Sequence, residues 1–373
     1  MKTPNSERVH IAFFGNCNSG KSSLINAITG EQTSLVSDVA GTTTDLVKRS
    51  VELPNIGAAL LIDTPGLDDN TTLGTLRTEQ SHKALMQTDI AVVLLPVKDE
   101  FLAQIRTLEI PVIMATPKAD VATEIYEDSI AVSATTGKGI DSLISAMANC
   151  CEQSSRLITE GVCSSGDTVV LVMPQDSSAP KGRLIKPQVE VLRELLDRGC
   201  SAICCQPDRL QATLSSLAEL PQAVITDSSA FATVKPLVPQ GVRLTSFSIL
   251  FAAYKGDIEL FKEGAKHLLS LPTTARILIA EACSHTPQNE DIGRVKLPRL
   301  LRKKLGESIT IETVSGTDFP ADLTPYDLVI HCGACMFTRR YVISRIAQAK
   351  AQGIAMTNYG VAIAALLGIE TID

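Results

Sequence analysis

A glycine-rich octapeptide near the start of the chain limits the possible folds more than any other segment. Residues 15–22 read G-N-C-N-S-G-K-S and match the pattern G-x-x-x-x-G-K-[ST] at every fixed position. An apolar run over residues 9–14 precedes it and a helical pattern over residues 23–28 follows it, which is the strand–loop–helix context that the motif requires. The sequence therefore predicts a P-loop within an α/β domain.

The P-loop residues are suited to hold a chain of phosphates and its metal ion. Gly15 and Gly20 let the backbone approach phosphate oxygens, while successive N–H groups and the helix N-terminus supply positive potential. We expect Lys21 to reach the β- and γ-phosphates and the Ser22 hydroxyl to bind Mg²⁺. The other residues of this segment expected to contact the nucleotide are Asn16, Asn18, Ser19 and Ser23.

Two later segments supply the remaining phosphate and magnesium contacts. Residues 41–45 read G-T-T-T-D, from which we expect Thr43 to bind Mg²⁺ and to sense the γ-phosphate. Residues 63–66 read D-T-P-G, so Asp63 is expected to hold Mg²⁺ through water and the Gly66 N–H to meet the γ-phosphate. The groups expected to act in hydrolysis are Lys21, Thr43 and Gly66.

The segment that reads the base departs from its usual pattern. It should read N-K-x-D, and residues 117–120 read P-K-A-D. Asp120 keeps the acceptor for two guanine N–H donors, and Lys118 keeps the stem that covers base and ribose, so GTP is favoured over ATP. Pro117 lacks the amide of Asn, and Thr116 is a partial substitute, so we expect weaker discrimination between bases. Two residues after a short strand are expected to back the base: Ser133 and Ala134.

These segments together resemble the translation-factor-like GTPases, especially those that modify tRNA or assemble ribosomes. Asn18 lies where such proteins use an Asn to hold K⁺, and Leu67 lies where Ras-like enzymes have a catalytic Gln. The resemblance implies that K⁺ near Asn18 partly replaces an arginine finger in neutralising charge in the transition state. The alternative is that Asn18 only forms a turn.

Strand and helix patterns alternate along the whole chain, which predicts α/β domains with largely parallel sheets. The apolar runs expected as strands include residues 10–14, 58–62, 90–95, 111–115, 168–173, 201–205, 223–225, 242–245, 276–280 and 328–331. A polar stretch at 152–167 and a helix end near 272 suggest two boundaries. We expect a P-loop GTPase domain over residues 1–155 and two smaller α/β domains over 165–265 and 266–373.

Cysteine and histidine cluster at two places in the last third of the chain. Residues 283–285 read C-S-H and follow the apolar run 276–280, and residues 331–335 read H-C-G-A-C and follow the run 328–330. Because the carboxyl ends of parallel strands meet at one edge of a sheet, we expect the two groups to lie close together. Cys332 and Cys335 have the spacing that chelates one metal centre, and Cys283 supplies a third thiolate.

Three thiolates without an evident fourth suit a [4Fe–4S] cluster with one exchangeable iron. A Cys₃His zinc site is the competing interpretation, with His285 or His331 as the fourth ligand. Both histidines also suit a role in orienting ligands rather than binding the metal. Buried thiols without a metal are the remaining alternative.

The Cys/His pattern downstream of this type of GTPase resembles the HydF family of [FeFe]-hydrogenase maturation GTPases, along the whole chain. Residues 357–360, T-N-Y-G, also look like that family. The resemblance implies a homodimeric scaffold and carrier, with residues 165–265 as the dimerisation domain and residues 266–373 as the iron–sulfur cluster-binding domain. It also implies Cys283, Cys332 and Cys335 as cluster ligands and leaves the fourth ligand open. It further implies that the protein receives a di-iron precursor made with radical-SAM maturases and delivers it to apo-[FeFe]-hydrogenase.

Composition argues against nucleic acid and membrane partners. The net charge is −7, Trp is absent and aromatic residues make up 4%, which disfavours a phosphate-binding face with stacking aromatics. The longest apolar runs, such as residues 90–97, are too short to span a bilayer, and the first residues carry no signal-peptide pattern, so we expect a cytoplasmic protein. The second functional hypothesis is an RNA- or ribosome-associated GTPase with a structural zinc domain.

Overall fold

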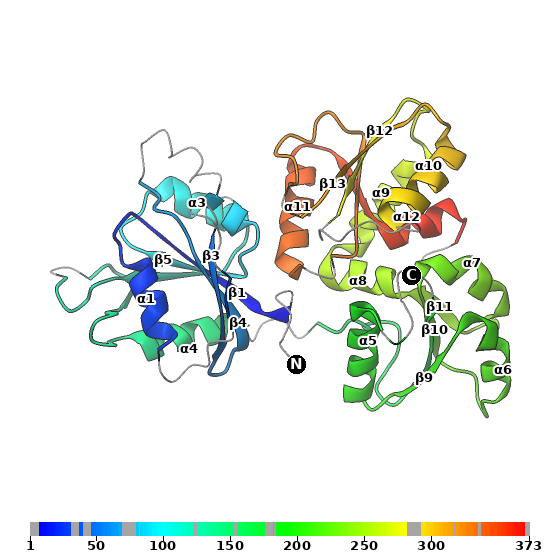
Figure 1. Ribbon diagram of the computed structural model, residues 1–373, viewed down its shortest axis with the longest axis horizontal. Coiled ribbons are helices and arrows are strands. Elements are labelled where there is room, and N and C mark those ends of the chain that lie inside the picture. Colours follow the sequence, from blue (N-terminus) through cyan, green and yellow to red (C-terminus); the bar gives the residue numbers. More distant parts are fainter. Residues whose placement is uncertain are drawn as a thin grey trace. The chain divides into compact units, whose positions relative to one another are not determined.

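The computed structural model describes residues 7–30, 37–39, 46–68, 80–81, 83–122, 125–151, 156–175, 182, 184–281, 292–316, 318–334 and 337–369. The chain forms two compact units, one of residues 1–155 with 336–345 and the other of residues 156–335 with 346–373. The first unit contains one sheet and the second contains two, and helices flank each sheet (Figure 1). The α/β class expected from the sequence is therefore confirmed.

The first unit is built on a seven-stranded sheet in the order β2-β3-β4-β1-β5-β6-β7. Its strands are β1 Val9–Gly15, β2 Ser37–Val39, β3 Val47–Leu53, β4 Gly57–Asp63, β5 Ile90–Leu94, β6 Val112–Thr116 and β7 Ile130–Ala131. The run from β4 through β1 to β7 is parallel, while β2 and β3 are antiparallel to their neighbours. The central strands are apolar on both faces because helices cover both faces.

Three helices of this unit have described bounds: α1 Lys21–Ile28, α3 Asp99–Thr107 and α4 Ile140–Cys151. Side chains of α1 and α4, such as Leu24 and Met147, pack with Phe13 on one face of the sheet. Ile105 of α3 packs with Phe14 on the other face. The sheet therefore has helices on both sides, and the loop after β1 opens at its carboxyl edge.

The second sheet has four parallel strands in the order β11-β10-β8-β9. Its elements are β8 Thr168–Val172, α5 Lys186–Asp197, β9 Ser201–Cys205, α6 Leu210–Ser215, β10 Ala223–Thr226, α7 Phe231–Val234, β11 Arg243–Ser246 and α8 Phe247–Lys255, with 3₁₀ turns at Pro207–Arg209, Ser228–Ala230 and Lys235–Leu237. Helices α5 and α8 cover one face, and α6 and α7 cover the other. Within the described residues β9 is an edge strand.

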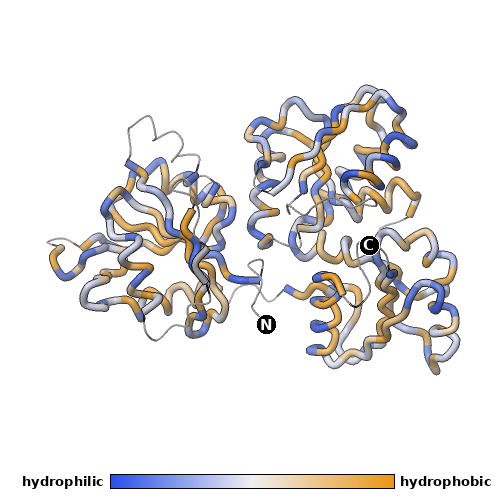
Figure 2. Tube along the Cα trace, in the orientation of Figure 1, coloured by the Kyte–Doolittle hydropathy of each residue, from blue (hydrophilic) through white to orange (hydrophobic). Residues whose placement is uncertain are grey.

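The third sheet also has four parallel strands, in the order β13-β12-β14-β15. Its elements are α9 Ile258–Leu269, β12 Arg276–Ala280, a π-helical turn Ile292–Lys296, α10 Leu297–Leu305, β13 Thr310–Val314, β14 Leu328–His331, α11 Arg339–Ala351, β15 Ala355–Asn358 and α12 Tyr359–Leu366. Its central strands β12 and β14 are mostly apolar and buried (Figure 2). The expected boundary between residues 265 and 266 falls inside α9, which packs on β15 so closely that a Cβ at Gly264 would lie 2.6 Å from the Met356 carbonyl carbon.

No helix among the described residues has both the length and the apolar character needed to cross a membrane.

Candidate functional site

The P-loop runs from the end of β1 to the start of α1. A Cβ at Gly15 would lie 2.8 Å from the Ser19 hydroxyl and 3.0 Å from the Leu94 carbonyl oxygen, so the turn leaves little room for a side chain there. Gly20 is the N-cap of α1 with a φ of 96°, a conformation that favours glycine. The two glycines expected from the motif are thus required by close approach at one position and by backbone conformation at the other.

Lys21 is buried beneath this loop, with 7% of its side chain exposed. Its Nζ donates to the carbonyl oxygens of Gly15 at 2.9 Å and of Asn16 at 2.8 Å. Burial lowers the pKa of Lys21, and nearby Asp63, Cys17 and Asp68 oppose that shift. A phosphate bound in the loop would favour the charged ammonium further, as expected for a phosphate-binding lysine.

The two magnesium residues that the structure describes lie side by side. The Ser22 hydroxyl at the start of α1 donates to Asp63 Oδ2 at the end of β4, over 2.5 Å. The Thr64 hydroxyl donates to the Phe13 carbonyl at 2.6 Å and fixes the end of β4 against β1. The third expected magnesium residue, Thr43, lies outside the described residues.

Gly66 lies against the P-loop. A Cβ at this position would come within 2.7 Å of the Cys17 amide nitrogen, so only glycine fits. Asp68, which the motif analysis did not single out, accepts a hydrogen bond from the Cys17 N–H at 2.6 Å. That hydrogen bond lowers the pKa of Asp68. The Asp68 carboxylate therefore accepts a hydrogen bond from an N–H group that is expected to bind phosphate.

Asn18 is exposed and has a φ of 57°. Asn tolerates this left-handed conformation better than most residues, so the backbone alone gives a reason for Asn here. The conformation agrees with the turn-forming interpretation and leaves K⁺ binding as a prediction.

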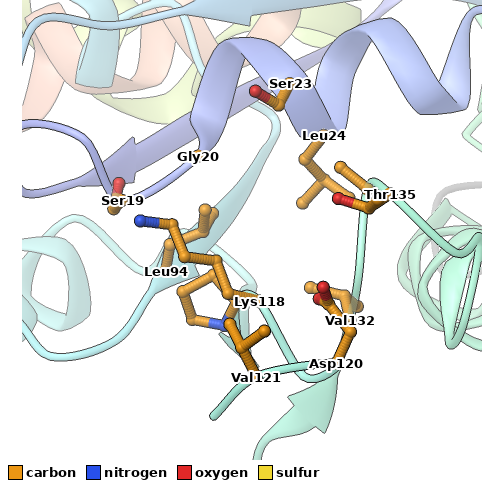
Figure 3. Close-up of a pocket in the computed structure, with 12 residues that line it drawn as sticks. Ser19, Gly20, Ser23, Leu24, Leu94, Lys118, Asp120, Val121, Val132 and Thr135 are labelled. Atoms are coloured by element: carbon orange, nitrogen blue, oxygen red, sulfur yellow. The ribbon is translucent and has the colours of Figure 1, made fainter.

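The base-reading loops enclose a cavity of about 220 Å³ between the P-loop and the strand ends. Figure 3 shows Lys118 extending toward Ser19, with Asp120 on the opposite wall. Ser133, fully buried, donates a hydrogen bond that lowers the pKa of Asp120. The residues that line the cavity are Ser19, Gly20, Ser23, Leu24, Leu94, Pro117, Lys118, Asp120, Val121, Val132, Ala134 and Thr135.

Thr116 does not line this cavity. Its hydroxyl is paired with the Ser129 hydroxyl at 2.6 Å and accepts the Tyr126 N–H at 3.1 Å. The expected substitution of Thr116 for the amide missing at Pro117 is therefore not supported. The cavity is lined by the two charged side chains expected to contact a guanine base, Lys118 and Asp120, and Pro117 supplies no side-chain amide.

The cysteine-bearing turn after β14 is held by hydrogen bonds over residues 332–334, here called the Cys332 loop. The Cys332 N–H donates to the Ala280 carbonyl at 3.0 Å, which ties the loop to the end of β12. The Ala334 N–H donates to Cys332 Sγ at 3.4 Å. Such N–H groups stabilise a thiolate, so this part of the donor set fits a metal-bound cysteine.

His331 and Asn358 hold the Cys332 loop from the neighbouring strands. His331 is fully buried, and its Nδ1 lies 2.7 Å from the Cys332 carbonyl, which also accepts from Asn358 Nδ2 at 3.2 Å. Because a carbonyl oxygen only accepts, His331 must carry its proton on Nδ1. Asn358 belongs to the T-N-Y-G segment, and its side-chain oxygen also caps α12 by accepting the Gly360 N–H at 2.9 Å.

Three of the expected metal residues, Cys283, His285 and Cys335, lie outside the described residues. Among the residues that are described, no group of three or more His, Cys, Asp or Glu is placed to hold a metal ion. The structure thus gives the surroundings of Cys332 and His331 and leaves the ligand set as a prediction. A carboxylate at the same sheet edge, Glu281, is buried and engaged by Arg294 at 3.1 Å.

Fold and site together define a P-loop GTPase domain followed by two parallel α/β modules. Residues 10–118 match the family described as 50S ribosome-binding GTPase. Residues 158–256 match the Hydrogen maturase F dimerization domain, and residues 259–371 match the Hydrogen maturase F tetramerization domain. These last two matches together span more than half of the 373 residues, and the chain belongs to the hydrogen maturase F, or HydF, family.

Individual relatives match the GTPase part alone. The tRNA modification GTPase MnmE of Acidiphilium cryptum is 32% identical over 144 residues, which are 38% of this chain and 32% of that protein. MnmE of Neisseria meningitidis is 31% identical over 151 residues, covering 37% of this chain and 34% of the relative. The chain therefore spans about a third of the length of these curated relatives.

Among solved structures, a single-residue variant of Aquifex aeolicus Era bound to GDP·AlF₄⁻ is 19% identical, with a TM-score of 0.33. The match covers 53% of this chain and 92% of Era.

Proposed function

We propose that this chain is a GTP-controlled scaffold of [FeFe]-hydrogenase maturation that binds a [4Fe–4S] cluster through Cys283, Cys332 and Cys335. In this proposal it accepts a di-iron precursor made with radical-SAM maturases and transfers it to apo-[FeFe]-hydrogenase in the cytoplasm. GTP hydrolysis, stimulated by K⁺ near Asn18, acts as a switch. The GTPase domain and the HydF modules are observations, whereas the cluster, the cargo and these partners are the proposal.

The observation that carries the proposal is the Cys332 loop. Cys332 directly follows a buried parallel strand, is half-buried, and receives an N–H on its sulfur. A free structural cysteine needs no such donor, whereas a cluster thiolate is stabilised by it. The strands β12 and β15 end at the same edge of the sheet. Cys283 follows the last residue of β12 by three positions in the sequence, and Asn358, the last residue of β15, contacts the Cys332 loop.

The nucleotide site supports a GTPase that works without a catalytic Gln. Lys21 contacts the P-loop carbonyls, Ser22 is hydrogen-bonded to Asp63, and Gly66 packs against Cys17 of the loop. These contacts support the proposed phosphate and Mg²⁺ binding. Leu67 offers no group to orient water. A slow, ion-assisted hydrolysis is therefore proposed, which suits a switch better than a turnover enzyme.

The dimerization and tetramerization domains imply oligomer formation. We propose that two copies pair along β9, the edge strand of the second sheet. Ser201 and Cys204 of β9 are exposed, and the adjacent helix α5 exposes Val189 at 48% and Leu196 at 53%. An unpaired strand edge beside an apolar helix face is a surface that a second copy would cover.

Iron and acid-labile sulfide analysis of anaerobically reconstituted protein tests this function. About four irons and four sulfides per chain are expected, because three thiolates without a fourth suit a [4Fe–4S] cluster. A colourless protein with one zinc per chain would contradict the proposal and favour a structural zinc domain.

A further inference from the structure

A lysine of the second sheet's last helix reaches the Cys332 loop. Lys255 is the final residue of α8 and is buried, with 5% of its surface exposed, and its Nζ donates to the Ala334 carbonyl at 2.9 Å. The same ammonium lies 5.5 Å from the centre of the Phe251 ring, one helical turn earlier. Burying an ammonium group costs free energy unless the group is paired, so these contacts of Lys255 are important for its burial.

The residue that Lys255 contacts has an unusual backbone conformation. Ala334 is 1% exposed and has a φ of 50°, in the left-handed region that disfavours an alanine. This conformation aims the Ala334 N–H at Cys332 Sγ, while the Ala334 carbonyl accepts from Lys255. The N–H and the carbonyl of Ala334 therefore bind two different partners, the sulfur of Cys332 and the ammonium group of Lys255.

Both backbone groups of Cys332 are also engaged. The Cys332 N–H binds the Ala280 carbonyl, and the Cys332 carbonyl accepts from His331 and Asn358. Those contacts come from the third sheet itself. Lys255 is different because it comes from α8, on the second module, and because it adds a positive charge close to the cysteine-bearing turn.

We infer that Lys255 is a positioning residue of the proposed cluster site. Its ammonium group holds the Cys332 loop in the conformation that presents the Ala334 N–H to sulfur, and its charge raises the reduction potential of a cluster bound there. A nearby positive charge stabilises the more negative, reduced cluster, which raises the potential. This inference rests on the proposed function for the cluster and stands by itself for the conformation of the loop.

The first test measures the loop without any metal. Hydrogen–deuterium exchange of the apo protein is compared for wild type, Lys255→Met and Lys266→Met, the last removing an exposed lysine of α9. We expect the segment that contains Ala334 to exchange about 10-fold faster in Lys255→Met and to be unchanged in Lys266→Met, since a lost anchor increases local opening. Equal exchange in all three proteins would overturn the anchoring role.

The second test measures the reconstituted cluster by redox titration followed by EPR. Lys255→Met is expected to lower the midpoint potential and to lose iron to a chelator about 10-fold faster, in the range seen when outer partners of metal ligands are removed. Lys255→Arg, which keeps the charge, is expected to retain most of the wild-type potential. If the Met variant does not fold, Lys255→Gln replaces it, with the same lowered potential expected.

The two tests distinguish a failure of the role of Lys255 from a failure of the proposed cluster-binding function. Wild-type protein that takes up no iron would contradict the proposed function, and loop exchange would still decide whether Lys255 anchors the loop. A wild-type cluster with the same potential and release rate in Lys255→Met would overturn the role of Lys255 alone. An Arg variant as low in potential as the Met variant would show that shape, not charge, matters, and would overturn the electrostatic part.

Discussion

The P-loop and the Cys332 loop are both short turns at the carboxyl end of a buried parallel strand, and a lysine with little exposure donates to carbonyl groups of each. Lys21 binds the carbonyls of Gly15 and Asn16, within its own motif. Lys255 binds the Ala334 carbonyl from a helix 79 positions earlier in the chain. Lys21 is part of its own sequence motif and can be identified from the sequence. Lys255 is far from the Cys332 loop in the sequence, so only the folded structure shows their contact.

The two loops also differ in what surrounds them. The middle of the P-loop is exposed, and Asn18 adopts its left-handed conformation in solvent. Ala334 has a similar positive φ while almost fully buried. An open turn suits a ligand that exchanges, and an enclosed turn suits a ligand that stays, so the contrast predicts that the two sites can be disabled separately.

The largest effect is expected from Lys21→Ala. Losing the ammonium group that is expected to contact the β- and γ-phosphates should reduce GTP hydrolysis about 10³-fold, as for removal of a group that stabilises transition-state charge. Iron content after reconstitution should not change, because the Cys332 loop lies in the other unit. Colorimetric phosphate release and iron analysis measure both, with exposed Lys83→Ala as the control. A loss of iron in the Lys21 variant would break the separation.

The reverse change is Cys332→Ser. A hydroxyl is a poor iron ligand compared with a thiolate, so most of the cluster should be lost, while GTP hydrolysis stays within about twofold of wild type. Exposed Cys204→Ser, on β9, is the matched control and should retain its iron. Equal iron in both variants would mean that Cys332 is not a ligand.

Asn18→Gly separates the two interpretations of Asn18. Glycine accepts a φ of 57° without strain, so the turn should survive while the side-chain amide is lost. If Asn18 binds K⁺, hydrolysis in K⁺ should fall about 10-fold to the rate in Na⁺, since the ion would replace part of an arginine finger. A turn-forming role alone predicts that the variant keeps any difference between the two salts.

The smallest effect is expected from Asp68→Asn. Because the Cys17 N–H lowers the pKa of Asp68, this carboxylate stays ionised at neutral pH and its contact weakens only as the pH falls below the usual range for Asp. An exposed charge is worth little, so removing it should tighten GTP binding about threefold, with less effect on GDP. Titration with fluorescent nucleotides measures this, and weaker GTP binding would show that Asp68 helps rather than competes.

The strands with long apolar runs, such as β12, β14 and β9, were predictable within a residue because their hydrophobic pattern is local. The edge strand β13 was not among the predicted strands, since Thr310–Val314 has only two apolar residues among three polar ones and is partly exposed. The P-loop residues followed from a motif whose glycines have local steric reasons. The roles of Asp68 and Lys255 could not be predicted, because the sequence does not show which residue a carboxylate or a lysine contacts in the folded chain. The same holds for Thr116, whose hydroxyl is hydrogen-bonded to Ser129.

Two cysteines that the structure describes as exposed lie at informative places, Cys17 in the P-loop and Cys204 on β9. A thiol reagent would report on two separate sites of one chain. Its reaction at Cys17 would slow when a nucleotide covers the loop, and its reaction at Cys204 would slow when a second copy covers the strand. Mass spectrometry of the two labelled peptides would therefore report nucleotide occupancy and assembly in a single sample of the wild-type protein.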